Sequence, residues 1–232
     1  MRIALMVIRN ILLVPYFLLS LWWKGRHDTK EKNYAFIKKL VTRVNRTGRV
    51  SIEANGLENL PKTDGYVLFP NHQGMFDVFV FLESCPRPFS FVYKKEVKNV
   101  AFAKQVSQAL NSLAIDRSDL RQSMRVIQEM TRRVVAGENF LIFAEGTRSK
   151  KGNRMNDMKG GSFKSAVKAK CPIVPCALID CYKPFDINSI KKVNVKVFYL
   201  EPITYEEYKD MTTLEIADLV KERIEKVLVN YA

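Results

Sequence analysis

The chain has 232 residues, of which 47% are hydrophobic and 27% are charged. This length suits one large domain, or one domain with an appendage, and the composition excludes global disorder because it provides enough apolar side chains for a core. The formal net charge of +14 favours a polyanionic partner: a nucleic acid, an anionic membrane or a phosphorylated substrate.

The first 48 residues combine the most apolar stretch of the chain with a concentration of basic residues. Ten lysines and arginines stand there against Asp28 and Glu31, so this segment carries +8 of the net charge. Positions 11–23 have no charge and end in Trp22 and Trp23. Basic residues beside a strongly apolar stretch are typical of an anionic membrane surface. Because neither zinc-finger spacing nor an RNA-binding aromatic motif occurs, we expect no nucleic-acid partner.

The way in which this stretch meets a membrane has three alternatives. As a helix, positions 11–23 would be about 20 Å long, which is shorter than the roughly 30 Å hydrocarbon core of a bilayer. A helix extended back to Ile3 reaches spanning length, but it encloses Arg9 and keeps Pro15. A signal peptide would need a small-residue cleavage site, and none follows. We expect a monotopic helix that dips into one leaflet, with a single span as the alternative.

Positions 34–44 predict a second helix with one apolar face, because apolar residues recur there at helical spacing with basic residues between them. This pattern suits an amphipathic helix at the lipid headgroups, and the alternative is an ordinary packing helix. We predict that residues 1–47 form a membrane-docking module of two helices and that residues 48–232 form the main domain.

After Gly48, short apolar runs alternate with helical patterns. The predicted strands are 50–54, 66–69, 89–93, 113–115, 140–143, 173–179 and 193–200. One predicted helix begins at 78, and the others cover 101–110, 120–135, 162–169 and 213–229. In the helix 120–135, Met124, Ile127, Met130 and Val134 are expected to share one face. This alternation predicts an α/β fold with one mainly parallel central sheet covered by helices on both faces.

The four cysteines show no spacing that is typical of a metal site or of a disulfide framework. They are Cys85, Cys171, Cys176 and Cys181. We expect small buried or half-buried residues in a reducing compartment, and no metal site.

A polar segment at 71–77 directly follows the predicted strand 66–69. It contains His72, one of only two histidines in the chain, and Asp77 five residues later. Imidazole titrates near neutral pH, and a carboxylate can fix its tautomer and raise its basicity. The pair is therefore suited to proton transfer; a capping Asp beside a solvated His is the alternative. No Gly-x-Ser-x-Gly elbow occurs, so a catalytic role for this pair would leave the attacking group to the substrate.

A second polar segment, at 145–149, follows the predicted strand 140–143 and begins with Glu145 and Gly146. Ligands of α/β proteins bind outside the carboxyl ends of the strands. Two strands that each deliver polar residues at that end predict one active site there. Taken alone, the second segment is equally consistent with a plain turn.

Together the two segments resemble motifs of the PlsC-type glycerolipid acyltransferases, and most nearly those of the 1-acylglycerol-3-phosphate acyltransferases. Two further blocks are similar: positions 94–97 with 114–117, and positions 172–175. The order and spacing match over residues 66–178, about half of the chain. Two departures stand out. Ala144 replaces the family's usual proline, and positions 99–104 lack the usual proline and glycine of a loop that shapes the acceptor or acyl groove.

This resemblance implies an enzyme that transfers a fatty acyl group from a thioester to the free hydroxyl of lysophosphatidic acid, giving phosphatidic acid. His72 would be the general base and Asp77 would orient it, with no acyl-enzyme. Acyl-CoA or acyl carrier protein would be a co-substrate, and no cofactor would be bound. The backbone near Gly146, or the helix start after His72, would stabilise the oxyanion. Substrate binding is assigned to Asn71, Lys95, Arg117, Glu145, Gly146, Thr147 and Arg148, and the three cations are candidates for the acceptor phosphate.

Several alternatives stay open. The acceptor could be glycerol 3-phosphate, another lysophospholipid or an acylated amine lipid, and a non-catalytic lipid-binding protein of the same fold is an alternative of another class. The basic segment 150–170 is either a solvated loop or a rim that attracts the phosphates of the donor or of anionic lipid. We expect a peripheral or monotopic protein of the cell membrane with its active site on the cytoplasmic side.

Overall fold

The computed structural model describes residues 1–99 and 101–231; position 100 of the predicted groove loop and position 232 of the predicted main domain lie outside the described residues. In chain order the elements are α1 (Arg2–Asn10), η1 (Ile11–Leu13), α2 (Val14–His27), α3 (Lys30–Thr47), β1 (Val50–Asn55), η2 (Leu57–Asn59), β2 (Val67–Pro70), α4 (Asp77–Ser84), β3 (Phe89–Lys94), η3 (Lys95–Asn99), α5 (Ala101–Ala109), β4 (Leu113–Ile115), α6 (Leu120–Val135), β5 (Asn139–Leu141), η4 (Gly160–Phe163), α7 (Lys164–Ala169), β6 (Ile173–Ile179), α8 (Lys183–Asp186), β7 (Val193–Tyr199), α9 (Tyr205–Tyr208), α10 (Thr213–Leu228) and η5 (Val229–Tyr231).

The strands form one seven-stranded sheet in the order β1-β7-β6-β2-β5-β3-β4. Neighbouring strands pair in parallel except β6 and β7, so β6, β2, β5, β3 and β4 share one direction and β1 and β7 run the other way. The predicted mainly parallel sheet is therefore confirmed. In the register, Leu68 of β2 lies opposite both Leu141 of β5 and Val174 of β6. The segment that follows β2 consequently emerges between the ends of β5 and β6.

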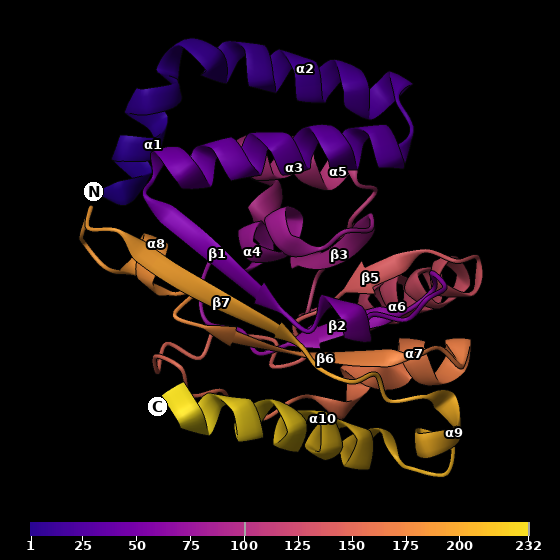
Figure 1. Ribbon diagram of the computed structural model, residues 1–232. Helices are drawn as coiled ribbons and strands as arrows, with labels where there is room; N and C mark the ends of the chain where they lie inside the picture. The colour runs from indigo at the N-terminus through magenta and orange to yellow at the C-terminus, as the bar shows by residue number, and fades with distance from the viewer. Residues whose placement is uncertain (100, 232) are drawn as a thin grey trace.

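Side chains of β2 alternate between two apolar cores, one on each face of the sheet. Leu68 packs in the core that includes α3 and α4, whereas Val67 and Phe69 pack in the core that includes α6, α7 and α10. Figure 1 shows α2 and α3 as layers above the sheet and α10 below it. Both faces are covered by helices, as the alternation of strands and helices predicted.

Each predicted strand and helix after residue 48 is present, with ends displaced by at most two residues. The expected face of α6 is partly wrong, because Met124 is exposed, whereas Val126, Met130 and Val134 are buried. Exposed Leu120 also lies in the first turn, so α6 packs on the sheet through its C-terminal part. The short helices α8 and α9 were not predicted from the sequence.

The four cysteines are free and buried, as expected. Burial raises the pKa of the Cys171 thiol to about 12, and it also raises the pKa of the Cys85 thiol. A thiol needs its thiolate form to react, so these residues are packing groups rather than nucleophiles.

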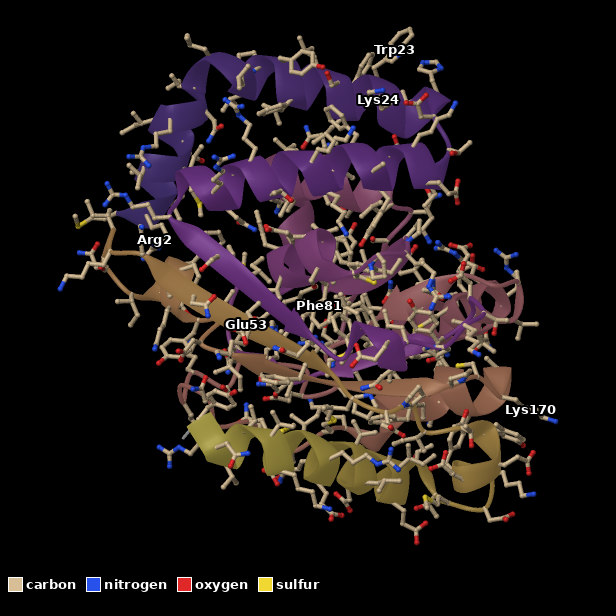
Figure 2. All side chains as sticks on the ribbon, viewed as in Figure 1. Arg2, Trp23, Lys24, Glu53, Phe81 and Lys170 are labelled. Carbon is tan, nitrogen blue, oxygen red and sulfur yellow. The ribbon has the colours of Figure 1, made fainter. Side chains whose placement is uncertain are left out.

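The N-terminal helices α1 and α2 expose most of their apolar side chains. Asn10 leaves the helical conformation (φ −118°, ψ 11°), and the turn η1 separates the two helices. The stretch Arg2–His27 contains an 18-residue window with a mean hydropathy of 2.0, so it is long and apolar enough for a membrane-crossing helix, a criterion that a signal sequence also meets. Its exposed apolar residues, which we call the N-terminal apolar face, are Ile3, Val7, Ile8, Ile11, Leu12, Tyr16, Leu19, Trp22 and Trp23. Trp23 points outward from α2 (Figure 2).

The next helix, α3, behaves differently, because the apolar face of positions 34–44 packs in the protein core rather than on lipid. Tyr34, Ile37 and Val41 are buried in the same core as Phe81 of α4. The Tyr34 hydroxyl donates a hydrogen bond to the Cys85 carbonyl (3.0 Å). An apolar helix face gains more from a protein core of matching shape than from the headgroup layer, and α3 is therefore an ordinary packing helix. The domain boundary at residue 47 stays a prediction, but α3 covers part of the main core.

Candidate active site

The loop after β2 brings His72 into direct contact with Asp77, the first residue of α4. Nδ1 of His72 lies 2.7 Å from Oδ2 of Asp77, whose side chain is fully buried. The Asp77 carboxylate also accepts hydrogen bonds from the backbone N–H groups of Gln73 (2.7 Å) and Gly74 (3.0 Å). Because a carboxylate only accepts, it holds the hydrogen of neutral His72 on Nδ1 and leaves Nε2 free to take a proton. The predicted pair is thus assembled with the geometry that general-base catalysis requires.

The His72 residue is fixed on three sides while its ring stays accessible. Its ring stacks on Phe143 (centroids 4.1 Å apart), and its side chain is 20% exposed. Its backbone N–H donates to Oε1 of Glu145 (2.6 Å), and its carbonyl accepts from the N–H of Ser149 (2.8 Å). The loop after β5 therefore holds the loop after β2 in place.

Glu145 uses both of its carboxylate oxygens on the protein backbone. Besides the bond from His72, Oε2 accepts from the N–H of Asn156 (2.9 Å). Burial raises the pKa of Glu145, while these two backbone bonds act in the opposite direction. Because both oxygens accept from backbone N–H groups, this arrangement favours a positioning role for Glu145 over direct contact with the substrate.

Asn71 is likewise directed at the protein. It is buried, its side-chain amide donates to the carbonyl of Leu178 (3.1 Å), and its Oδ1 accepts from the N–H of Leu178 (2.7 Å). These two bonds extend the pairing of β2 with β6 by one residue beyond the strand. The geometry therefore favours a positioning role for Asn71 over contact with substrate.

Sequence reasoning missed Gln73, which connects the motif loop to two other segments. Its Nε2 donates to the Leu178 carbonyl (2.8 Å) and to Oδ1 of Asn153 (3.0 Å), and its Oε1 accepts from the N–H of Cys181 (2.7 Å). The only signal in the sequence was its place between His72 and Asp77.

Gly146, Thr147 and Arg148 form the turn that follows Glu145. Gly146 has φ 76°, a left-handed conformation that glycine adopts without strain, and its N–H donates to the carbonyl of Phe143 (3.1 Å). Thr147 is exposed and Arg148 is half-buried. Arg148 directly precedes Ser149, whose N–H bonds to His72, and no ion pair among residues 1–99 and 101–231 includes Arg148. Arg148 is therefore the candidate cation nearest to the His72 loop along these contacts.

Three of the candidate oxyanion donors are engaged elsewhere. The N–H of Gly146 bonds to Phe143, and those of Gln73 and Gly74 bond to Asp77. A developing oxyanion needs donors that are aimed at it and free. The three amides therefore position the loops instead.

Lys95 and Arg117 lie farther along the same edge of the sheet. Lys95 follows β3 and forms an ion pair with Asp116, which follows β4, and Arg117 is exposed. Since β5 separates β2 from β3, Lys95 starts two strand spacings, roughly 10 Å, from the end of β2. No hydrogen bond or ion pair recorded for residues 1–99 and 101–231 links Lys95 or Arg117 to the cluster around His72.

The basic segment 150–170 wraps around the site. Its Lys159 N–H donates to the carbonyl of Ala144 (2.9 Å), and Asn156 and Asn153 make the bonds described above. Lys151 and Arg154 line a cleft with Tyr182, beside Asn153. These hydrogen bonds favour an ordered role for segment 150–170 at the edge of the site over a freely solvated loop. Across the described part of the chain, no group of three His, Cys, Asp or Glu residues could hold a metal ion.

Comparisons with known proteins relate this chain to acyltransferases. A family model described as Acyltransferase matches residues 51–179. The chain is 28% identical over 178 residues to the chloroplastic 1-acyl-sn-glycerol-3-phosphate acyltransferase of Arabidopsis thaliana, covering 75% of this chain and 49% of that protein. It is 24% identical to the 1-acyl-sn-glycerol-3-phosphate acyltransferase of Borreliella burgdorferi, covering 78% and 74%.

Among solved structures, that of the 1-acyl-sn-glycerophosphate acyltransferase PlsC of Thermotoga maritima is similar to the whole fold. The TM-score is 0.75 at 22% identity, and the match covers 100% of this chain and 98% of that one. The chain spans about half the length of the plant relatives it matches, 49% of the Arabidopsis protein and 46% of the Cocos nucifera one.

Proposed function

We propose that this chain, which belongs to the acyltransferase family whose model matches residues 51–179, moves a fatty acyl group from a thioester to the free hydroxyl of lysophosphatidic acid, giving phosphatidic acid. The names of its relatives support this acceptor. The observation that carries the proposal is the 2.7 Å contact between His72 and buried Asp77, in a loop whose other polar side chains are bonded to backbone.

The reaction needs one proton carrier and no covalent enzyme intermediate. Nε2 of His72 takes the proton of the acceptor hydroxyl as its oxygen attacks the thioester carbonyl carbon. The tetrahedral intermediate then breaks its carbon–sulfur bond, and the departing thiolate takes the proton back from His72. Asp77 stabilises the imidazolium in between, and such general-base help is worth about 10²–10⁴-fold in rate.

Arg148 is our candidate for binding the acceptor phosphate. It lies next to the His72 loop, and its guanidinium offers a planar pair of donors that matches phosphate. Lys95 and Arg117 stay predictions for the acceptor phosphate. For the donor, acyl-CoA and acyl carrier protein both stay open, and Lys151 and Arg154 of the cleft beside Asn153 are the cations available for its phosphates.

Docking to an anionic membrane through the N-terminal apolar face belongs to the same proposal, because the acceptor is itself a membrane amphiphile. Arg2 donates to the carbonyls of Gly48 (2.7 Å) and Lys191 (2.8 Å), which ties α1 to the main body of the protein. A helix tied at this end favours a monotopic arrangement over a span. We place the active site on the cytoplasmic side, consistent with four free cysteines.

A panel of acceptors tests the proposal directly. Lysophosphatidic acid, glycerol 3-phosphate and other lysophospholipids are incubated with labelled acyl-CoA or acyl carrier protein, and the products are resolved by mass. We expect phosphatidic acid from the wild type and at least a hundredfold less from His72→Ala, a loss equal to the lower bound of general-base help. The matched control is His27→Ala, since His27 is the other histidine and is exposed on α2.

The opposite result would be thiol release no faster than with His72→Ala for every pair of donor and acceptor. That result would favour a non-catalytic lipid-binding protein of the same fold. A different preferred acceptor would leave the chemistry in place and change only the substrate.

A further inference from the structure

A basic cleft lies between α1 and the outer side of α3, away from the candidate active site. We call it the α1–α3 cleft; its lining residues are Arg9, Lys39, Thr42, Arg43, Arg46 and Thr47. Positions 39, 42, 43 and 46 fall on one side of α3 at helical spacing. The buried residues Ile37 and Val41 lie on the other side, so this stripe faces away from the core.

The charge of the cleft is not balanced by the protein. Four of its six lining residues are cations, and no carboxylate lines it. None of these four cations takes part in an ion pair recorded for residues 1–99 and 101–231. Cations held close together repel one another, and an anion between them removes that repulsion.

Hydrogen bonds hold two of the arginines in place. Oδ1 of buried Asn10 accepts from Nε of Arg43 (3.1 Å), and Nδ2 of Asn10 donates to the hydroxyl of Thr47 (2.8 Å). Arg9 donates through one terminal nitrogen to the Thr47 carbonyl (2.8 Å). A guanidinium has five N–H donors, so each arginine keeps most of its donors for a ligand. Arg9 also covers a carbonyl at the C-terminal end of α3, whose partial negative charge would otherwise repel an anion.

The cleft borders the N-terminal apolar face. Ile8 precedes Arg9 in the chain, and Ile11 and Leu12 follow Asn10; all three apolar side chains are exposed, Leu12 to 90%. Cations directly beside apolar side chains match the depth at which lipid headgroups meet acyl chains. A nucleic acid or a soluble anion would make no use of the apolar border.

We propose that the α1–α3 cleft binds the phosphate of an anionic phospholipid and thereby sets how the N-terminal apolar face docks on the membrane. The inference rests on the membrane docking proposed above. Arginine forks match the paired oxygens of phosphate, and Lys39 and the Thr42 hydroxyl add a charge and a donor.

Flotation with vesicles tests the cleft without relying on acyl transfer. One set of vesicles is phosphatidylcholine, and the other contains about 30% phosphatidylglycerol, an anionic lipid. The cleft variant is Lys39→Gln/Arg43→Gln/Arg46→Gln, and the matched control is Arg121→Gln/Arg125→Gln/Lys226→Gln. The control removes the same charge from exposed positions on α6 and α10, which cover the other face of the sheet.

We expect the wild type and the control to prefer the anionic vesicles, and the cleft variant to lose that preference by tenfold or more. A cation at such a surface contributes about fivefold in partitioning. Binding to phosphatidylcholine alone should be unchanged, because the apolar face is intact. Arg43→Lys/Arg46→Lys keeps the charge but removes the paired donors of the guanidinium groups. Its preference for anionic vesicles should fall about halfway, on a logarithmic scale, between that of the wild type and that of the cleft variant.

A cleft variant that keeps its preference for anionic lipid, or a control that loses as much, would overturn the proposal. Wild-type protein that floats equally with both vesicles would overturn it as well, while leaving membrane docking in place. Wild-type protein that floats with neither would overturn docking and the cleft together. The acyl-transfer proposal stands or falls separately, on the acceptor panel.

Discussion

The loop after β2 and the N-terminal helices α1 and α2 differ in whether their side chains find partners inside the protein. In the loop, the buried polar side chains of Asn71, Gln73 and Asp77 all hydrogen-bond within the chain. On the helices, large apolar side chains such as Leu19 stay exposed. A buried polar group without a hydrogen-bond partner costs free energy, and so does a large apolar side chain exposed to water. The loop is therefore complete before a substrate arrives, whereas the helices need a surface to cover them.

The largest effect is expected from a substitution of Asp77, whose carboxylate holds the loop after β2. Asp77→Asn should lower turnover by about 10²–10⁴-fold because the amide cannot stabilise the imidazolium. It should also lower the free energy of unfolding by about 1–3 kcal/mol. In the variant, an amide group would replace the carboxylate that accepts hydrogen bonds from the backbone N–H groups of Gln73 and Gly74 in the wild type. Turnover and urea denaturation measure the two losses.

His72→Ala is the matched variant for that experiment. His72 is partly exposed and is held through its backbone, so its loss should reduce turnover as much while stability changes little. An Asp77→Asn protein as stable as the wild type would contradict the view that this carboxylate organises the loop.

The second prediction concerns the N-terminal apolar face. Leu12→Ser/Leu19→Ser/Trp23→Ser should lower partitioning into vesicles by on the order of 10²-fold, because each large side chain contributes up to about 1.5–3 kcal/mol when it leaves water. Activity on short-chain soluble acceptors should persist, since none of the three residues belongs to the core clusters.

A matched control uses exposed apolar residues elsewhere, Leu120→Ser/Leu214→Ser/Val229→Ser, at 75%, 66% and 73% exposure. These should leave flotation unchanged. Equal losses for both triples would show that no single face meets the membrane. Substitution is preferable to deleting residues 1–47, because that deletion would also remove Ile37 and Val41 from the core.

The third prediction concerns the cation beside the loop. Arg148→Ala should raise the apparent KM for the acceptor by about 10- to 100-fold, the loss of a charge-assisted phosphate contact of about 1.5–3 kcal/mol, while the KM for the donor changes little. Arg148→Lys should recover part of the loss because the charge returns without the fork. Arg117→Ala serves for comparison and should have a smaller effect. A similar rise in both KM values would assign Arg148 to the donor or to the fold.

The smallest effect concerns Glu138, which ties α3 to the body of the protein. It forms ion pairs with Lys30 of α3 (2.8 Å) and Arg133 of α6 (2.6 Å), and these hydrogen bonds lower its pKa to about 2. A depressed pKa stabilises the fold above the unfolded value of about 4.5, and this stabilisation is lost as pH falls toward 2.

Glu138→Gln should therefore lower the free energy of unfolding at pH 7 by about 1–2 kcal/mol, a value reduced for the partial exposure of the carboxylate. The difference from wild type should shrink toward zero near pH 2. Urea denaturation across this range measures it, with exposed Glu201→Gln as the control. A difference that is independent of pH would mean that the charge of Glu138 is not its source.

Much of the fold and the centre of the site followed from local patterns. Strands and helices after residue 48 were placed within two residues because apolar periodicity reports which side of an element is covered. His72 and Asp77 lie in one short loop, so their contact needed little beyond their spacing. Glu145 could be placed near them because parallel strands end at a common edge.

Only the tertiary structure distinguished α2 from α3, because the sequence left two interpretations open for positions 34–44: an amphipathic helix at the lipid headgroups and an ordinary packing helix. A periodic pattern shows that a face is apolar, but not whether protein or lipid covers it. The same holds for Gln73, whose partners Asn153 and Cys181 lie far along the chain. Long-range bonds of this kind depend on how loops close in space, and local sequence does not encode that closure.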